Sequence, residues 1–270
     1  MFQADLIFDV GMHLGEDTDF YLKKGFRVVA FEANPDLLRH CQLRFAEELA
    51  SGKLTIVSGA VAAGGAQTVP FYVNITNTTW GTLHPAWVAR NERYGAKSRL
   101  IEVQTVDIVE NFHKYGVPYY LKIDVEGSDT VVAQSLRSVS DRPHYISIET
   151  DINRFSHVVG EIELLRSLGY RRFKPVQQAN MKGKHVSVND RDGRPFEHFF
   201  EMGATGPFGD DLPGEWLDHR ACRRAYRSIF ARYWAAGHLS PFSRCGWHKP
   251  RWRLQRLIGV AGWHDLHASL

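Results

Sequence analysis

The stretch FDVGMHLGEDT, residues 8–18, decides the fold of this 270-residue chain. It starts inside an apolar run, LIFDV (residues 6–10), which is typical of a strand in a parallel sheet with helices on both faces. Gly11 and Gly15 then frame a turn that opens a helix. Glycine lets a ligand come close to the backbone N–H groups at the positive end of the helix dipole. The order of strand, glycine turn and helix predicts a nucleotide-type cofactor site.

Glu32 ends the next apolar strand, residues 27–31, 21 positions after Gly11. A carboxylate at this place can accept both hydroxyls of an adenosine ribose, which dinucleotides and S-adenosylmethionine share. Dinucleotide sites use GxGxxG to seat the pyrophosphate, whereas this turn is GxxxG and follows Asp9. An anion at Asp9 repels phosphate and suits the ammonium group of a methionine moiety, so the pattern favours S-adenosylmethionine.

Further acids stand at the ends of later strands. The segment YYLKIDVEGSD, residues 119–129, is a buried-strand pattern that ends in Asp124 and Glu126, and the strand at 144–148 ends at Glu149. Ligands of open α/β sheets bind at the carboxyl ends of the strands, so we expect these acids to share one rim with the glycine turn. A single acid there usually caps a helix, but a series at successive strand ends favours a site.

These segments resemble the FkbM-family methyltransferases. The similarity runs in the family's order over roughly residues 5–175, through FDVGMHLGEDT, FEANP (31–35), VSGAVAA (57–63), TVDIV (105–109), LKIDVEG (121–127) and YISIET (145–150). LKIDVEG is the most specific of these elements. The resemblance implies a Rossmann-like seven-stranded methyltransferase sheet, S-adenosylmethionine as donor, and usually methylation of a hydroxyl on a sugar, glycan or natural product. One departure is the first loop, where the family more often has Gly-Ala-Asn-Ile-Gly and this chain has Met12 and His13.

Methyl transfer to oxygen requires alignment of donor and acceptor and removal of the hydroxyl proton. We expect Glu126 to be the base, ahead of Asp124, with His84 and His157 as weaker candidates. An alternative, ranked lower, is a Mg²⁺ ion held by Asp124, Glu126 and Glu149. The residues expected to contact the cofactor are Asp9, Gly11, His13, Gly15, Thr18, Glu32, Ala33, Ala60 and Asp124, and those expected to contact the acceptor are Trp80, Thr82, Glu126 and Glu149. Trp80 either stacks on an acceptor ring or anchors its own loop.

Strands alternate with helical patterns through residue 150, which predicts βαβ units. We expect a helix over residues 35–50 with Asn34 as its N-cap, and a long polar and aromatic loop over residues 74–98 that acts as a lid or contacts substrate. The length suits one α/β domain, residues 1–190, with helices on both faces, followed by a basic, mostly helical extension, residues 191–270.

The extension is strongly basic. Residues 217–256 hold ten Lys or Arg and one acid, which leaves the rest of the chain near −6, and five of the seven tryptophans lie from Trp216 onward. Such a surface suits an acidic glycan, phospholipid headgroups or nucleic acid. The alternative is an amphipathic helix over 218–236 whose arginines face water while Ile229, Phe230, Tyr233 and Trp234 pack on the domain. The last residues, 262–270, are expected to fold back toward the site.

No segment has the pattern of a secretion signal or the length of a membrane span, so we expect a cytoplasmic protein. Cys41, Cys222 and Cys245 form no CxxC pair, which argues against a disulfide framework or a zinc site. The leading hypothesis is an S-adenosylmethionine-dependent O-methyltransferase that acts on a hydroxylated carbohydrate or related small molecule. The alternatives are a nicotinamide-dependent oxidoreductase, and a nucleic-acid or membrane-binding module with a vestigial site. Nucleic acid is disfavoured because most of the chain is acidic.

Overall fold

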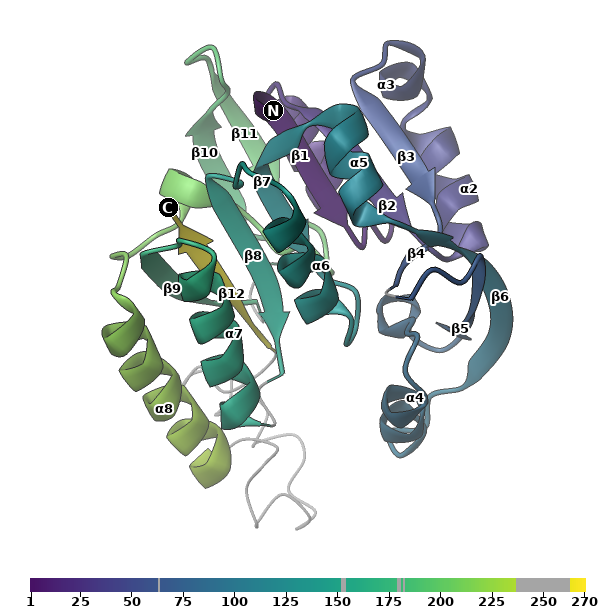
Figure 1. Ribbon diagram of the computed structural model, residues 1–270. Helices are drawn as coiled ribbons and strands as arrows, with labels where there is room; N and C mark the ends of the chain where they lie inside the picture. The colour runs from purple at the N-terminus through teal and green to yellow at the C-terminus, as the bar shows by residue number, and fades with distance from the viewer. Residues whose placement is uncertain (63, 152–153, 179–180, 182, 237–262) are drawn as a thin grey trace.

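A seven-stranded sheet runs through the centre of the molecule, with the strand order β3-β2-β1-β7-β8-β12-β9 (Figure 1). The computed structural model describes residues 1–62, 64–151, 154–178, 181, 183–236 and 263–270. The strands of this sheet are β1 (Phe2–Val10), β2 (Arg27–Glu32), β3 (Leu54–Ser58), β7 (Val117–Ile123), β8 (Tyr145–Thr150), β9 (Arg172–Gln177) and β12 (His264–Ser269). The predicted α/β fold is confirmed.

The sheet has a topological switch point between β1 and β7. β1, β2 and β3 follow one another in parallel toward one edge, and the chain then returns so that β7 and β8 lie parallel on the other side of β1. A parallel sheet with this reversal opens a crevice at the carboxyl ends of the strands beside the switch point. The glycine turn after β1 and the LKIDVEG segment after β7 therefore meet at the same place.

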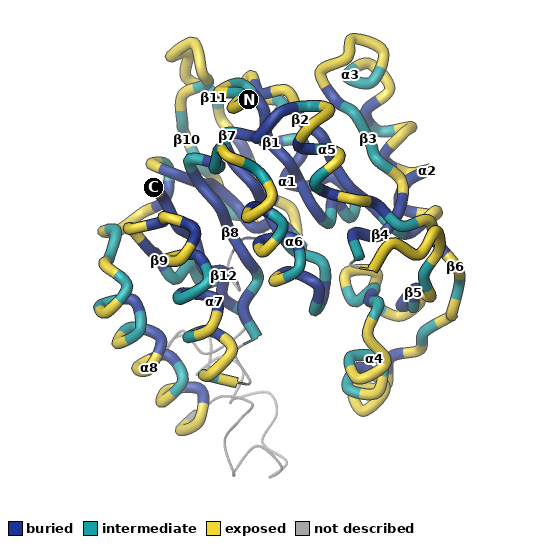
Figure 2. The backbone as a smooth tube through the Cα atoms, in the orientation of Figure 1, coloured by how far each residue is buried: buried dark blue, intermediate teal, exposed yellow. Residues whose placement is uncertain are grey.

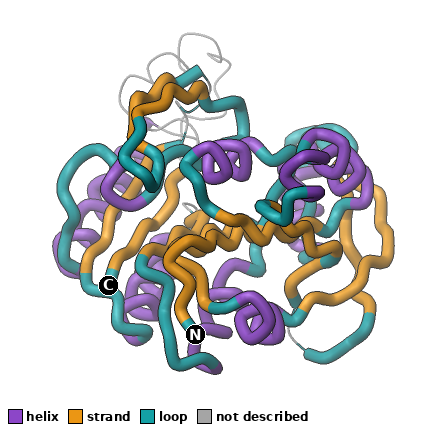
Figure 3. Tube along the Cα trace, turned by 90° about the horizontal axis from the view of Figure 1, so that it is seen from above, coloured by secondary structure: helices purple, strands orange, loops and turns teal. Residues whose placement is uncertain are grey.

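Helices cover both faces of the sheet, as predicted (Figure 3). The helices of the described chain are α1 (Glu16–Lys23), α2 (Pro35–Arg44), α3 (Ala46–Ala50), α4 (Pro85–Glu92), α5 (Ile108–Tyr115), α6 (Asp129–Ser135), α7 (Phe155–Ser167) and α8 (His219–Ala236), of which α4 lies away from this sheet, near β5 and β6. α5 to α8 bury apolar side chains against one face, and α1 and α2 pack on the other. The part of that second face over β7 and β8 is covered by the segment that carries Phe200, Ala204 and Phe208.

The C-terminal end of the chain forms an interior strand. β12 lies antiparallel between β8 and β9, and His264 pairs with Thr150 on one side and Gln177 on the other. The expectation that the chain end folds back is confirmed. The expected extension, residues 191–270, thus contributes β12 to the same sheet as β8 and β9, which satisfy its backbone hydrogen bonds.

Two predicted segments have a different local structure. The helix expected over residues 35–50 is broken at Phe45 into α2 and α3, although Asn34 caps it as predicted, accepting a 3.0 Å hydrogen bond from the Asp36 N–H. Residues 74–98 are not one loop, because they contain a 3₁₀ turn (Thr78–Trp80) and α4. Smaller elements are β4 (Ala60–Val61), β5 (Thr68–Asn74) and β6 (Ser98–Val106), the hairpin of β10 (His185–Asn189) and β11 (Pro195–Phe199), and 3₁₀ turns at Leu136–Ser138 and Gly209–Asp211.

The outer face of α8 is basic and exposed (Figure 2). Ile229 and Tyr233 are buried as predicted, but Trp234 is 63% exposed because it lies about 100° around the helix from Tyr233. Residues 237–262, with Cys245 and five of the ten Lys and Arg residues of the segment 217–256, lie outside the described residues. Within the described residues, none of the helices is both long and apolar enough to cross a membrane.

Candidate functional site

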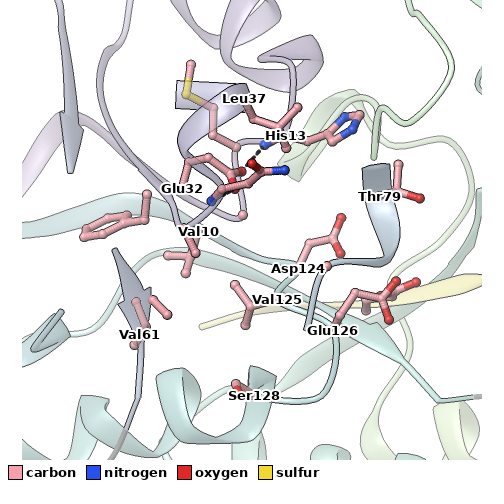
Figure 4. Close-up of a pocket in the computed structure, with 18 of the residues that line it drawn as sticks. Val10, His13, Glu32, Leu37, Val61, Thr79, Asp124, Val125, Glu126 and Ser128 are labelled. Carbon is pink, nitrogen blue, oxygen red and sulfur yellow. Dashed lines mark hydrogen bonds between the residues drawn. The ribbon is translucent and has the colours of Figure 1, made fainter. Parts of the chain in front are cut away.

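A pocket opens at the carboxyl ends of β1, β2, β7 and β8, as the topology predicts (Figure 4). It encloses about 1080 Å³, counting the open space at its mouth. Of the residues predicted to form the site, its lining includes Gly11, His13, Glu32, Ala33, Ala60, Trp80, Asp124, Glu126 and Glu149. The lining does not include Asp9, Gly15, Thr18, Thr82 or His84.

Gly11 brings the turn after β1 into direct contact with the end of β7. Its φ is +92°, and a Cβ atom at this position would lie 1.8 Å from the Asp124 carbonyl oxygen. The N–H groups of Gly11 and Met12 both donate to the Phe31 carbonyl at the end of β2, at 3.1 and 3.0 Å. Only glycine fits this junction of three strand ends. Glycine is needed at position 15 for a different reason, because the Cα of Gly15 packs against the Phe45 ring.

Glu32 is a buried carboxylate held by backbone amides. Its Oε2 accepts from the His13 N–H at 2.9 Å and its Oε1 accepts from the Asn34 N–H at 2.8 Å. Burial raises the pKa of Glu32, and these amide hydrogen bonds oppose that shift. Each carboxylate oxygen has a second lone pair, so Glu32 can still accept hydroxyls of a ligand.

His13 connects the glycine turn to the opposite wall. Its ring nitrogens lie 2.9 Å from Glu16 Oε1 and 2.8 Å from Thr78 Oγ1. The backbone φ of His13 is +53°, which is uncommon for a residue other than glycine, and its backbone N–H at the same time donates to Glu32. His13 therefore fixes the position of the 3₁₀ turn that carries Trp80 relative to Glu32.

Asp9 does not face the pocket, which corrects its predicted contact with the cofactor. The side chain is fully buried, accepts a 2.6 Å hydrogen bond from Thr18 Oγ1 through Oδ2, and lies 3.2 Å from Lys122 Nζ through Oδ1. The strand register explains this, since Asp9 of β1 stands directly beside Lys122 of β7. Thr18 is likewise an internal partner of Asp9.

Lys122 and Asp17 are site residues that the sequence analysis missed. Both line the pocket, and Lys122 Nζ lies 3.4 Å from Asp17 Oδ2 and 3.7 Å from Asp124 Oδ2, in addition to Asp9. Burial alone lowers the pKa of Lys122, but the three aspartates raise it well above the usual value, so the amine stays charged. A lysine within the apolar strand LKI was the available signal, because a buried lysine needs acidic partners.

The turn after β7 holds Glu126 in a left-handed conformation, with φ +45°. The Asp129 carboxylate accepts from the N–H groups of Val125 and Gly127, at 3.2 and 3.1 Å, and Thr82 Oγ1 donates to the Glu126 carbonyl at 2.7 Å. Thr82 thus supports Glu126 from behind and is not part of the pocket lining. A φ of this sign is costly for glutamate and is retained where the surrounding contacts fix it.

The two candidate histidines lie elsewhere. His84 stands at the start of α4 with Nε2 3.2 Å from Ser128 Oγ, and it is absent from the pocket lining. His157 Nδ1 lies 3.8 Å from Asp151 Oδ2, also outside the lining. The positions of these side chains therefore give no support to either histidine as a base.

The Glu126 carboxylate is buried and has one oxygen without a hydrogen bond. Its side chain is 8% exposed, Oε2 has no hydrogen-bond partner, and the nearest cation is Arg90, 3.6 Å away and seated on the Trp87 ring at 3.9 Å. Burial, and next the charge of Asp124, raise the pKa of Glu126 to about 8 against the effect of Arg90. A carboxylate that titrates near neutral pH is suited to accept a proton.

Glu149 and two tryptophans complete this end of the pocket. Burial and the charges of Glu126 and Asp124 raise the pKa of Glu149 well above its usual value. Trp80 lies in the 3₁₀ turn, and the centre of its ring is 6.5 Å from that of the Tyr94 ring. Trp263 directly precedes β12 and also lines the pocket. Trp263 was not named as a site residue, although residues 262–270 were expected to fold back toward the site.

The pocket fits S-adenosylmethionine better than a metal ion. Glu32 offers acceptors for a ribose diol, Gly11 allows close approach, and Leu37, Val61 and Phe71 give an apolar wall for a base. Among the described residues, no group of three or more His, Cys, Asp or Glu side chains is placed to hold a metal ion.

Comparison with known proteins agrees with this geometry. The model of the "Methyltransferase FkbM domain" family matches residues 9–172, more than half of the chain. No curated protein matches the sequence significantly.

The solved structures that match include three methyltransferases. An FkbM methyltransferase from Methylobacillus flagellatus KT is 16% identical, with a TM-score of 0.41 over 64% of this chain and 40% of that one. A SAM-dependent methyltransferase from Archaeoglobus fulgidus is 12% identical, with a TM-score of 0.40 over 99% and 87%. Precorrin-6y C5,15-methyltransferase from Geobacter metallireducens GS-15 is 12% identical, with a TM-score of 0.38 over 74% and 77%.

Proposed function

Since the chain belongs to the FkbM methyltransferase family and its methyl donor is S-adenosylmethionine, we propose that it methylates a hydroxyl of a sugar, glycan or related small molecule. Because the chain belongs to this family, nothing now favours the alternative that it is a nicotinamide-dependent oxidoreductase. The observation that carries the proposal is Glu126, a buried carboxylate in the pocket with an oxygen that accepts no hydrogen bond and with a pKa of about 8.

The donor end of the proposed site is the end with Glu32. When bound, S-adenosylmethionine supplies an electrophilic methyl group on a sulfonium. Glu32 would accept the ribose hydroxyls, and Leu37, Val61 and Phe71 would surround the adenine. Asp124 lies between Glu32 and Glu126 in the view of Figure 4, where it can position the methionine part of the donor.

The acceptor end is the end with Glu126. Methylation of a hydroxyl releases its proton, and a nearby base lowers the barrier by taking it up as the new bond forms. Glu126 is that base in our proposal, with Arg90 stabilising its charged form at 3.6 Å. Trp80 and Glu149 would contact the acceptor, as the sequence suggested.

The experiment uses S-adenosylmethionine with a ¹³C-labelled methyl group and a panel of sugars, cyclitols and glycans. We expect S-adenosylhomocysteine to form together with a ¹³C signal of a methyl ether in one acceptor class. A methylamine or C-methyl signal, or donor binding without transfer to any hydroxylated acceptor, would contradict O-methylation. The variant Glu47→Gln, an exposed glutamate of α3, is the matched control for substitutions in the site.

We also propose that the outer face of α8 contacts an anionic surface, such as an acidic glycan or phospholipid headgroups. Arg220, Arg224 and Arg227 are exposed along this face, and Trp234 lies on it at its end. Binding to anionic vesicles or to an acidic polysaccharide should weaken with salt and with the triple change of these arginines to glutamine. Binding that is unaffected by either would contradict this contact.

We further propose that the protein acts in the cytoplasm. Cys41 and Cys222 are both buried free thiols, which agrees with a reducing compartment.

A further inference from the structure

The pocket is unusually rich in acids. Its acidic lining residues are Glu16, Asp17, Glu32, Asp124, Glu126 and Glu149, and among the residues that the structure describes its basic lining residues are Lys122 and His13. The amine of Lys122 is already shared among three aspartates. Beside Glu126 and Glu149, a ligand group with a positive charge is therefore favoured over one with a negative charge.

Four of the six acids have partners within the protein. These are Glu16 with the His13 ring and the Leu14 N–H, Asp17 with the N–H groups of Thr205 and Gly206, Glu32 with those of His13 and Asn34, and Asp124 with Lys122. Glu126 has no hydrogen bond to Oε2 and only a distant contact with Arg90. The strongest influences on the carboxyl of Glu149 are burial and the neighbouring acids Glu126, Asp124, Asp129 and Asp265, all of which raise its pKa.

Glu149 lies at the end of the pocket opposite Glu32. β2 and β8 are three positions apart in the sheet, so their ends stand roughly 14 Å from each other. With the ribose at Glu32, the space beside Glu126 and Glu149 is left for the acceptor. Trp80 and Trp263 also line the pocket, and tryptophan faces pack on rings and attract cations.

We propose that the acceptor is a ring alcohol that carries a protonated amine, as in an amino sugar or an aminocyclitol, and that Glu149 binds this ammonium group. The inference rests on the proposed function and names its substrate class. An amine that is held as ammonium has no free electron pair, so the neighbouring hydroxyl remains the group that is methylated. Its proton passes to Glu126.

A divalent cation fits these carboxylates less well, because the described acids do not form a group of three ligands. A neutral polyol brings no cation that would favour the ionised form of Glu149, and a uronic acid brings a like charge. A ring that carries an ammonium group should therefore bind most tightly, a neutral ring less tightly, and a ring that carries a carboxylate least tightly.

The test is calorimetric titration of the full-length protein, saturated with S-adenosylhomocysteine, with glucosamine, N-acetylglucosamine, glucose and glucuronate. We expect glucosamine to bind at least tenfold more tightly than N-acetylglucosamine, and glucuronate not to bind. Because the ammonium favours the ionised carboxylates, glucosamine should also release protons, measurable as heats that differ between buffers of different ionisation enthalpy. Glu149→Gln should abolish the tenfold preference, whereas Glu47→Gln should retain it.

Equal affinity for glucosamine and N-acetylglucosamine, binding of glucuronate, no proton release, or binding of none of the four rings would overturn the inference. A preference that survives Glu149→Gln would remove Glu149 from the role. The same titrations separate this inference from the proposed function. If S-adenosylhomocysteine itself fails to bind, the proposed donor site is wrong. If it binds but the four rings do not show the expected order of affinity, only the proposed class of acceptor is wrong.

Discussion

Two buried glutamates at opposite ends of the pocket differ in what surrounds their oxygens. Both Glu32 and Glu126 are 8% exposed and both follow strands of the parallel sheet. Glu32 has a backbone N–H on each carboxylate oxygen, whereas Glu126 has an oxygen with no hydrogen bond and an acidic neighbour in Asp124. Equal burial therefore gives a fixed hydrogen-bond acceptor in one place and a proton acceptor in the other.

The difference comes from the local backbone. Asn34 lies two residues after Glu32, and the glycine turn brings the His13 N–H to its other oxygen, so two amides point at the carboxylate. Glu126 stands in a left-handed turn whose amides on either side are taken by Asp129. The turn thus directs the neighbouring N–H groups away from the Glu126 carboxylate, whose charged partner is Arg90 at 3.6 Å.

The largest expected effect is that of Glu126→Gln. Methyl transfer to the acceptor should fall by roughly 10²–10⁴-fold, since the amide cannot take up the proton. Affinity for S-adenosylhomocysteine should stay within about twofold, because the donor lies at the other end of the pocket. Single-turnover rates and calorimetry measure the two quantities, and full turnover in Glu126→Gln would show that another group is the base.

The second largest effect is expected from Glu32→Ala, which should weaken binding of the donor. Loss of hydrogen bonds between a carboxylate and the ribose should weaken S-adenosylhomocysteine by roughly 10- to 150-fold. Glu32→Gln, which keeps one acceptor oxygen, should lose less, and Glu47→Gln should lose nothing. If donor affinity in Glu32→Ala matches the unaltered protein, the ribose does not bind at Glu32.

A third prediction concerns pH. Glu126 acts as a base only when ionised, and its pKa of about 8 means that most molecules carry it protonated at neutral pH. The rate of methyl transfer should therefore rise with pH by about fiftyfold between pH 6 and pH 8 and then level off. A profile that is flat over this range, with donor and acceptor saturating, would be inconsistent with this base.

The smallest effect is expected from Thr82→Val, which removes the hydrogen bond to the Glu126 carbonyl. The turn should loosen and the rate should fall by roughly two- to tenfold, with an altered pH profile and unchanged donor affinity. Thr82→Ser, which keeps the hydroxyl, should restore both the rate and the profile. Failure of serine to restore them would mean that the threonine acts through packing.

The sequence predicted the acids of the rim well, for a simple reason. Parallel strands end at the same edge of the sheet, so residues that follow β2, β7 and β8 meet there whatever the details of packing. Glu32, Asp124, Glu126 and Glu149 were found in this way, and all four line the pocket.

Features that depend on pairing between distant segments were missed. Asp9 was assigned to the cofactor because its partner Lys122 lies 113 residues away, and only the register of β1 on β7 brings the two together. Trp263 was missed because β12 runs antiparallel, so the start of this strand, and not its end, reaches the pocket edge.

The most direct test of the division between a donor end and an acceptor end is a crystal structure with S-adenosylhomocysteine bound. Our account predicts that the ribose hydroxyls bond to Glu32 and that the sulfur faces the space beside Glu126 and Asp124. A ribose at Glu126 or Glu149, or a sulfur directed away from Glu126, would contradict it.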